Sequence, residues 1–131
     1  MKKIFPISLL LTIGFIVAII ILLQKNTTAT VVPNGQSHVS IVDGTQVIAI
    51  DAKGGYAPRN TTAKANMPTT LNIKTNGTYD CSSSVSIPSL GYRTNLPPSG
   101  ITPVEIPPQP AGTTINGVCA MGMYHFAVNF Q

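Results

Sequence analysis

The chain has 131 residues, which is enough for one domain of ordinary size and a short terminal segment. Charged residues make up only 9% of it, and three of the eight basic side chains, Lys2, Lys3 and Lys25, flank an apolar run. Without these three, the net charge of +4 falls almost to zero, so a basic surface for nucleic acid is not indicated. Eleven glycines and eleven prolines predict many turns, which are typical of an all-β sandwich rather than a helix bundle.

An uncharged run from Ile4 to Leu23 lies near the N-terminus. As a helix it would be about 30 Å long, which matches the hydrocarbon core of a bilayer. A cleaved signal peptide is the alternative, but its apolar region is usually about 7–15 residues long and ends at a small-x-small site that residues 26–30 do not offer. We therefore expect residues 1–25 to form a single transmembrane anchor in the cell membrane. Two lysines before the run against one after it place the domain on the extracytoplasmic side, and the opposite, cytoplasm-facing orientation stays open.

Residues 26–37 are polar and without periodicity, and we expect them to form a tether between the anchor and one domain of residues 38–131. In that domain, short apolar alternations between turn signals predict about seven or eight strands of a Greek-key sandwich. The expected strands cover residues 46–51, 69–75, 85–87, 104–106, 114–118 and 124–130, and turns are expected at Gly54–Pro58 and Asn76–Gly77.

The two cysteines, Cys81 and Cys119, are the first candidates for chemistry. An even number of cysteines in a chain that leaves the cytosol is typical of a structural disulfide. Such a bridge would close a loop of about 39 residues and stabilise the fold by about 3–4 kcal/mol. A structural module held by this disulfide is therefore one hypothesis.

A different hypothesis comes from the sequence around the second cysteine, where Cys119, Met121 and Met123 are spaced by two just before the last expected strand. Thiolates and thioethers are soft donors, and soft donors select Cu(I) over hard cations. Methionine often only fills gaps in a core, but here two of the four methionines stand beside a cysteine in an expected loop. This pattern indicates a sulfur site for Cu(I).

Four segments together resemble a particular cupredoxin family: Gly54–Pro58, Cys81 with the serines after it, Ile87–Pro88, and the run from Cys119 to Tyr124. The family includes the cupredoxin-like modules of copper-transporting P-type ATPases and the membrane-anchored Cu(I)-binding proteins of bacterial copper resistance. The resemblance covers about residues 40–131 and implies an eight-stranded β-sandwich with the metal at one end. It also implies that one or two Cu(I) ions, bridged by thiolate if there are two, bind at Cys81, Cys119, Met121 and Met123.

The two histidines decide whether a blue copper site is expected. Such a site holds its ion with two histidines, one cysteine and a weak axial methionine. His38 precedes the first expected strand, and His125 falls on the more polar face of the last one, so we expect neither to bind metal. The family pattern tends to a small or non-histidine residue at the position of His125. Because this chain departs from that pattern, a site with both sulfur and nitrogen ligands stays open.

We do not expect an enzyme. The four carboxylates show no spacing typical of an acid–base pair, Asp80 is expected to be a solvated turn residue, and the serines after Cys81 lack His–Asp partners. We expect a copper chaperone or buffer in copper homeostasis and resistance, exchanging Cu(I) with a copper-transporting P-type ATPase or another copper carrier. The alternatives are an electron-transfer cupredoxin or oxidase-associated subunit, and the structural module with a Cys81–Cys119 disulfide.

Overall fold

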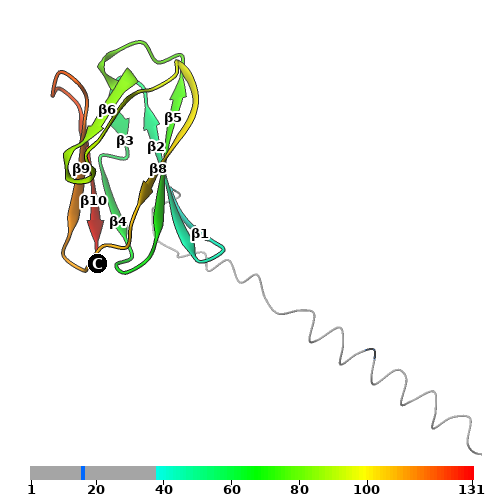
Figure 1. Ribbon diagram of the computed structural model, residues 1–131. Helices are drawn as coiled ribbons and strands as arrows, with labels where there is room; N and C mark the ends of the chain where they lie inside the picture. The colour runs from blue at the N-terminus through cyan, green and yellow to red at the C-terminus, as the bar shows by residue number, and fades with distance from the viewer. Residues whose placement is uncertain (1–15, 17–37) are drawn as a thin grey trace, which may run out of the picture.

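A computed structural model describes Ile16 and residues 38–131, in which two five-stranded sheets pack face to face (Figure 1). The expected anchor, apart from Ile16, and the expected tether lie outside the described residues. Within the described part of the chain, no helix has the length and apolar character needed to cross a bilayer.

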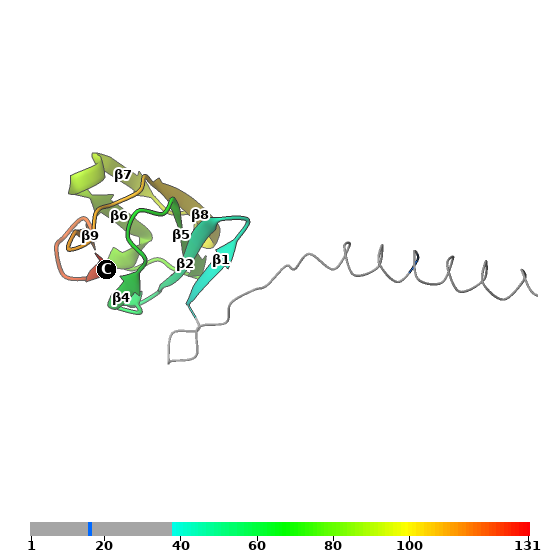
Figure 2. The same ribbon diagram turned by 90° about the horizontal axis from the view of Figure 1, so that it is seen from below.

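The first sheet has the strand order β1–β2–β5–β8, with β3 beside the end of β2 (Figures 1 and 2). Its strands are β1 (Val39–Val42), β2 (Thr45–Ala52), β3 (Tyr56–Ala57), β5 (Thr69–Asn76) and β8 (Ser99–Ile106). β2 and β5 run parallel, and the other pairs are antiparallel. Pro103 lies in β8, an edge strand, which is where a residue without an N–H group is tolerated in a sheet.

The second sheet has the order β4–β10–β9–β6–β7. Its strands are β4 (Asn60–Ala63), β6 (Ser84–Ile87), β7 (Tyr92–Asn95), β9 (Thr114–Val118) and β10 (His125–Phe130). β10 is paired on both sides, parallel to β4 and antiparallel to β9. Two single-turn 3₁₀-helices, η1 (Cys81–Ser83) and η2 (Pro88–Leu90), precede and follow β6.

The core lies between the two sheets and is built from alternate residues of their strands, because successive side chains of a strand point to opposite faces. β2 and β5 supply aliphatic side chains, and β10 supplies two aromatic rings. The central residues, each exposed by 1% or less, are Ile48, Ile50, Leu71, Ile73, Phe126, Val128 and Phe130. Burying each of these side chains stabilises the fold by about 1.5–3 kcal/mol.

The predicted all-β sandwich is confirmed, and each expected strand is present. β9 matches its expected range, whereas β8 begins at Ser99, before the expected residue 104. The sequence pattern misses β1, β4 and β7 and assigns the two residues of β3 to the Gly54–Pro58 turn, so residues 38–131 contain ten strands where the resemblance implied eight. β4 escapes because it reads Asn-Thr-Thr-Ala: its inward positions hold a threonine and an alanine, which give little hydrophobic contrast.

Gly117 in β9 is opposite Phe126 of β10 and faces the core. A Cβ atom at this position would overlap the fully buried Phe126 ring, so the ring or the strand backbone would have to shift. We expect Gly117→Ala to lower the free energy of unfolding by about 3 kcal/mol, the upper end of the range for overpacked cores. Urea unfolding measures the effect, and Asn116→Ala, at the exposed neighbour, should change it by less than about 0.5 kcal/mol. Equal stability of Gly117→Ala and the wild type would contradict this packing.

Candidate metal centre

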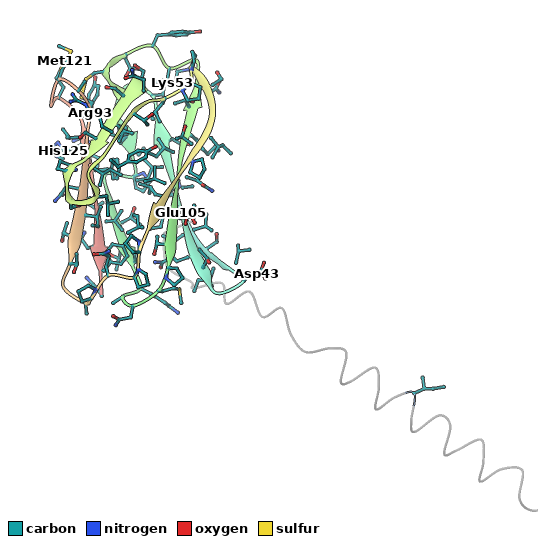
Figure 3. All side chains as sticks on the ribbon, in the orientation of Figure 1. Asp43, Lys53, Arg93, Glu105, Met121 and His125 are labelled. Atoms are coloured by element: carbon teal, nitrogen blue, oxygen red, sulfur yellow. A yellow bond between two sulfur atoms is a disulfide. The ribbon has the colours of Figure 1, made fainter. Side chains whose placement is uncertain are left out.

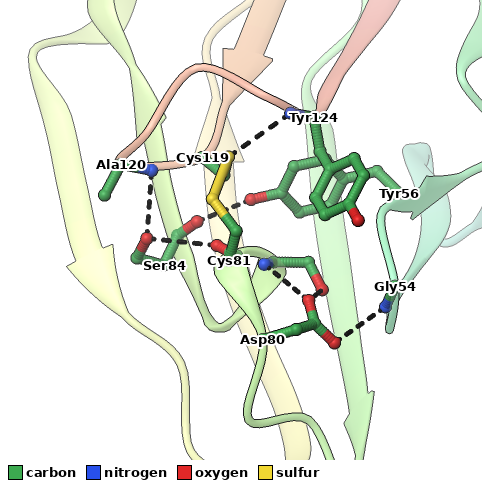
Figure 4. Close-up of a disulfide and its surroundings, with 9 residues drawn as sticks. Gly54, Tyr56, Asp80, Cys81, Ser84, Cys119, Ala120 and Tyr124 are labelled. Carbon is green, nitrogen blue, oxygen red and sulfur yellow. Dashed lines mark hydrogen bonds between the residues drawn. A yellow bond between two sulfur atoms is a disulfide. The ribbon is translucent and has the colours of Figure 1, made fainter.

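Cys81 and Cys119 meet at one end of the sandwich, where η1 leads into β6 and β9 leads into the loop before β10 (Figure 4). They are 38 positions apart in the sequence, yet their Cα atoms are 5.9 Å apart and their sulfur atoms form a disulfide. The antiparallel pairing of β6 with β9, at Ser86 and Val118, brings the two segments together. The structure therefore joins the two predicted cysteine ligands in one place.

Exposure increases from the cysteines to the methionines. Cys119 is 2% exposed and Cys81 is partly buried, whereas Met121 is 75% and Met123 62% exposed. Figure 3 shows Met121 on the loop between β9 and β10, projecting from that end of the sandwich. The loop thus presents two thioethers to solvent beside a sulfur pair that is mostly covered.

Three hydrogen bonds donated by backbone N–H groups shape this loop. The N–H of Cys119 donates to the carbonyl of Tyr124 at 3.0 Å, and the N–H of Gly122 donates to the carbonyl of Cys119 at 3.0 Å. The N–H of Tyr124 points back to the Cys119 sulfur at 3.4 Å. The loop is therefore organised around the sulfur of Cys119.

Asp80 connects the first cysteine to a distant turn. Its carboxylate caps η1 by accepting from the N–H of Ser82 at 2.8 Å and from the Ser82 hydroxyl, and its other oxygen accepts from the N–H of Gly54 at 2.9 Å. These bonds, of which the Ser82 hydroxyl contributes most, hold the pKa of Asp80 below its usual value. Asp80 is exposed, as expected, but it is also a link between the Cys81 segment and the Gly54 turn.

The turn itself reaches both cysteine segments through three consecutive residues (Figure 4). Gly54 donates to Asp80. The ring of Tyr124 lies 3.5 Å from where a Cβ atom of Gly55 would be, and Gly55 has a φ of +124°, so any side chain here would be strained. The Tyr56 hydroxyl donates to the carbonyl of Ser84 at 2.6 Å. Burial, with a smaller effect of the Asp80 charge, raises the pKa of Tyr56 to about 12.

The two histidines are the other potential soft or borderline donors in residues 38–131. His125 pairs with Val118 and is exposed on the outer face of β10, where the next residue, Phe126, points into the core (Figure 3). His38 lies next to β2, where its carbonyl accepts from the N–H of Ala49 at 2.8 Å. Residues 38–131 contain no group of three or more histidine, cysteine, aspartate and glutamate side chains placed to hold a metal ion. The proposed donors at this end are therefore the sulfur atoms of the two cysteines and of the two methionines in the loop after Cys119.

Ser84 is a residue that the sequence analysis considered only as a nucleophile. Its hydroxyl accepts from the N–H of Ala120 at 3.1 Å and donates to the carbonyl of Cys81 at 3.4 Å. The sequence holds no direct signal for this role, because the two partners are three and 36 positions away. It follows only from the pairing of β6 with β9.

We expect stability to depend on pH through Asp80. Because its pKa is lowered in the folded state, the carboxylate stabilises the fold above about pH 4, the usual pKa of aspartate, and this contribution is lost as the pH falls through the folded-state pKa. Asp80→Asn keeps an oxygen for Ser82 but turns an N–H₂ group toward Gly54. The variant should be less stable than the wild type at neutral pH, and the difference should shrink in acid.

Urea unfolding at about pH 7 and about pH 3 measures this difference. Asp43→Asn, at the opposite end of the domain from Met121 (Figure 3), is the matched control and should show no such convergence. A stability difference between wild type and Asp80→Asn that is the same at both pH values would contradict the role of the carboxylate.

Comparisons with known proteins agree with this architecture. The model of the cupredoxin-like domain family matches residues 12–128. The metal binding domain of the Cu(I) exporting P-type ATPase CopA of Streptococcus pneumoniae D39, solved with Cu(I), is 19% identical with a TM-score of 0.63, over 71% of this chain and 92% of that domain. A copper binding protein solved by NMR in its apo form is 26% identical with a TM-score of 0.64, over 71% and 94%. A comparison with curated proteins gave no match. Since the family model covers most of its length, this chain belongs to the cupredoxin-like domain family.

Proposed function

We propose that this protein binds Cu(I) at the sulfur-rich end of its sandwich. One or two ions would be held by Cys81, Cys119, Met121 and Met123. The observation that carries the proposal is that the fold joins two cysteines from distant parts of the sequence and places a loop with two exposed methionines directly beside them. Thiolate and thioether donors select Cu(I). The similarity to a copper binding protein and to a domain solved with Cu(I) supports the same ligand.

The disulfide is the oxidised form of the proposed site. A dithiol reductant that supplies two electrons and two protons, and is itself oxidised to a disulfide, opens it to two thiols. The sulfur atoms of these thiols are already neighbours and can share one ion after losing their protons. The N–H of Tyr124 is in place to donate to the Cys119 thiolate. Gly122, with a φ of +70°, lets the loop turn between the two methionines. The residues present therefore fit a soft, closed-shell cation.

The exposure gradient suits a protein that passes copper on. A ligand set that is buried at Cys119 and open at Met121 and Met123 allows a partner's sulfur ligand to approach the ion from solvent. We propose a copper chaperone or buffer in copper homeostasis and resistance. Its partner would be a copper-transporting P-type ATPase or another copper carrier.

The disulfide also favours a second candidate, a structural module without metal. In that case Cys81 and Cys119 would stay permanently bonded and stabilise the fold by about 3–4 kcal/mol, and the methionines would be incidental. An electron-transfer site has less support, because His125 lies on the outer face, away from the buried side of Cys119. Titration of the reduced protein with Cu(I) separates these candidates.

We expect the reduced full chain, in a mild detergent, to bind Cu(I) without visible colour, because a closed-shell Cu(I) site lacks the absorption of a Cu(II)–thiolate bond. Cys81→Ser and Cys119→Ser should each lower the affinity by orders of magnitude, since thiolates are the anionic soft donors of the site. Competition with a chromogenic Cu(I) chelator measures affinity and stoichiometry. Tight binding after both substitutions would rule out the site, and a copper-indifferent protein whose disulfide resists reduction would support the structural module.

The same titration resolves the two methionines, which we expect to differ. One thioether would complete a three-coordinate site with both thiolates, and the other would bind weakly or serve a second ion. Met121→Leu and Met123→Leu keep the volume and remove only sulfur, and Met67→Leu, in the turn before β5, is the matched control. Unchanged affinity and stoichiometry in both loop variants would reduce the site to two thiolates.

We also propose that residues 1–25 anchor the protein in the cell membrane as a single span, with the domain on the extracytoplasmic side. The support is the uncharged run between Ile4 and Leu23 and the lysine asymmetry around it. After an alkaline wash, the full chain should remain with the membranes, and protease added to intact cells should cleave the domain. Release by the wash would contradict an anchor, and a protected domain in a retained protein would indicate the cytoplasm-facing orientation.

A further inference from the structure

Ser84, the first residue of β6, bonds to the segments of both cysteines (Figure 4). Its hydroxyl accepts from the N–H of Ala120, the residue after Cys119, at 3.1 Å, and donates to the carbonyl of Cys81 at 3.4 Å. Its own N–H donates to the same Cys81 carbonyl, and its carbonyl accepts from Tyr56. The residue is therefore fixed by its backbone while its side chain reaches across to the methionine loop.

The bond from the Ala120 N–H to the Ser84 hydroxyl lies where the pairing of β6 with β9 ends. The described ladder between β6 and β9 consists of the single pair of Ser86 and Val118. Continuing the same antiparallel register places Ala120 opposite Ser84, and here a side-chain oxygen accepts the N–H of Ala120. The Ser84 hydroxyl thus extends the contact between the two strands as far as the cysteines. This bond does not involve sulfur, so opening the disulfide does not remove either of its partners.

We propose that Ser84 is a positioning residue of the sulfur site, and that its hydroxyl sets the separation of the two thiols in the reduced protein. Donors that are held in place before the ion arrives lose less conformational freedom when it binds, so affinity rises without an added ligand. The consequence for copper rests on the proposed function. The positioning itself can be measured without metal, as the tendency of the two thiols to form a disulfide.

The test compares Ser84→Ala, which loses the hydroxyl, with Ser84→Thr, which keeps it. Ser86→Ala, two residues along the same face of β6, is the matched control. The reduced full chain, in a mild detergent, is equilibrated with reduced and oxidised glutathione, which gives the effective concentration of one thiol at the other. We expect Ser84→Ala to lower this value, and the Cu(I) affinity, about fivefold, the effect of losing one net hydrogen bond. Ser84→Thr should restore both to within about twofold, and Ser86→Ala should leave both unchanged.

Loss of global stability alone does not change the effective concentration in a protein that stays folded, so circular dichroism of each variant is recorded alongside. An unchanged effective concentration in Ser84→Ala overturns the positioning role, whatever the protein does with copper. A lowered value that Ser84→Thr does not restore also overturns it, because the hydroxyl would then not be responsible. A lowered and restored value in a protein that does not bind Cu(I) supports the positioning role and refutes the proposed function instead.

Discussion

The pairing of β6 with β9 is the constraint on which the sulfur-bearing end depends. A strand alternates its side chains between two faces, so a shift of one residue in this register would exchange the inner and outer faces of one strand relative to the other. Gly117 and Phe126 fix the neighbouring register of β9 and β10, because a shift there would bring a side chain against the Phe126 ring. The alignment of the two cysteines is thus held in part by core packing that begins at Gly117, two residues before Cys119.

The turn at Gly54, which belongs to the first sheet, contacts the segments around this pairing from the opposite side of the sandwich. It contacts the segment before Cys81 through Asp80, the residue after the methionine loop through Tyr124, and the start of β6 through Ser84. On its own side, the turn makes each contact with its backbone or with a rigid ring rather than with a flexible side chain. The Gly54 turn thus contacts three of the segments that surround the cysteines. The loop with Met121 and Met123 is the part of this end that is exposed to solvent.

The sequence predicted the features that depend on local pattern. Alternation located β9, and the spacing of Cys119 with Met121 and Met123 identified a loop of soft donors. It missed β1, β3, β4 and β7. These strands are short and lie at the edges of their sheets or carry mainly polar side chains, so their hydrophobic alternation is weak. The proximity of Cys81 to Cys119 was expected both from the disulfide hypothesis and from the family resemblance, and the spacing of the two residues along the chain gave no sign of it.

The contacts of Ser84 and Asp80 could not have been predicted from the sequence either. Ala120 lies 36 positions from Ser84, and Gly54 lies 26 positions from Asp80. Such contacts become visible only when the register of β6 with β9, and the place of the Gly54 turn, are known. Local patterns therefore identified most of the proposed ligands, whereas the residues that support them required the fold.

The place of β10 in the second sheet has a consequence for how the domain is made. β4 has its ladder partner in β10, where Asn60 pairs with Ala127, and these two strands are far apart along the chain. Contacts of such long sequence separation slow folding, because a large loop must close before they form. During synthesis, the pairing of β4 with β10 must wait for residues 125–130, so Cys81 leaves the ribosome well before the last strand that packs around Cys119 is made. Throughout that interval, the first cysteine is available to any oxidant, thiol or metal ion in the compartment where the chain emerges.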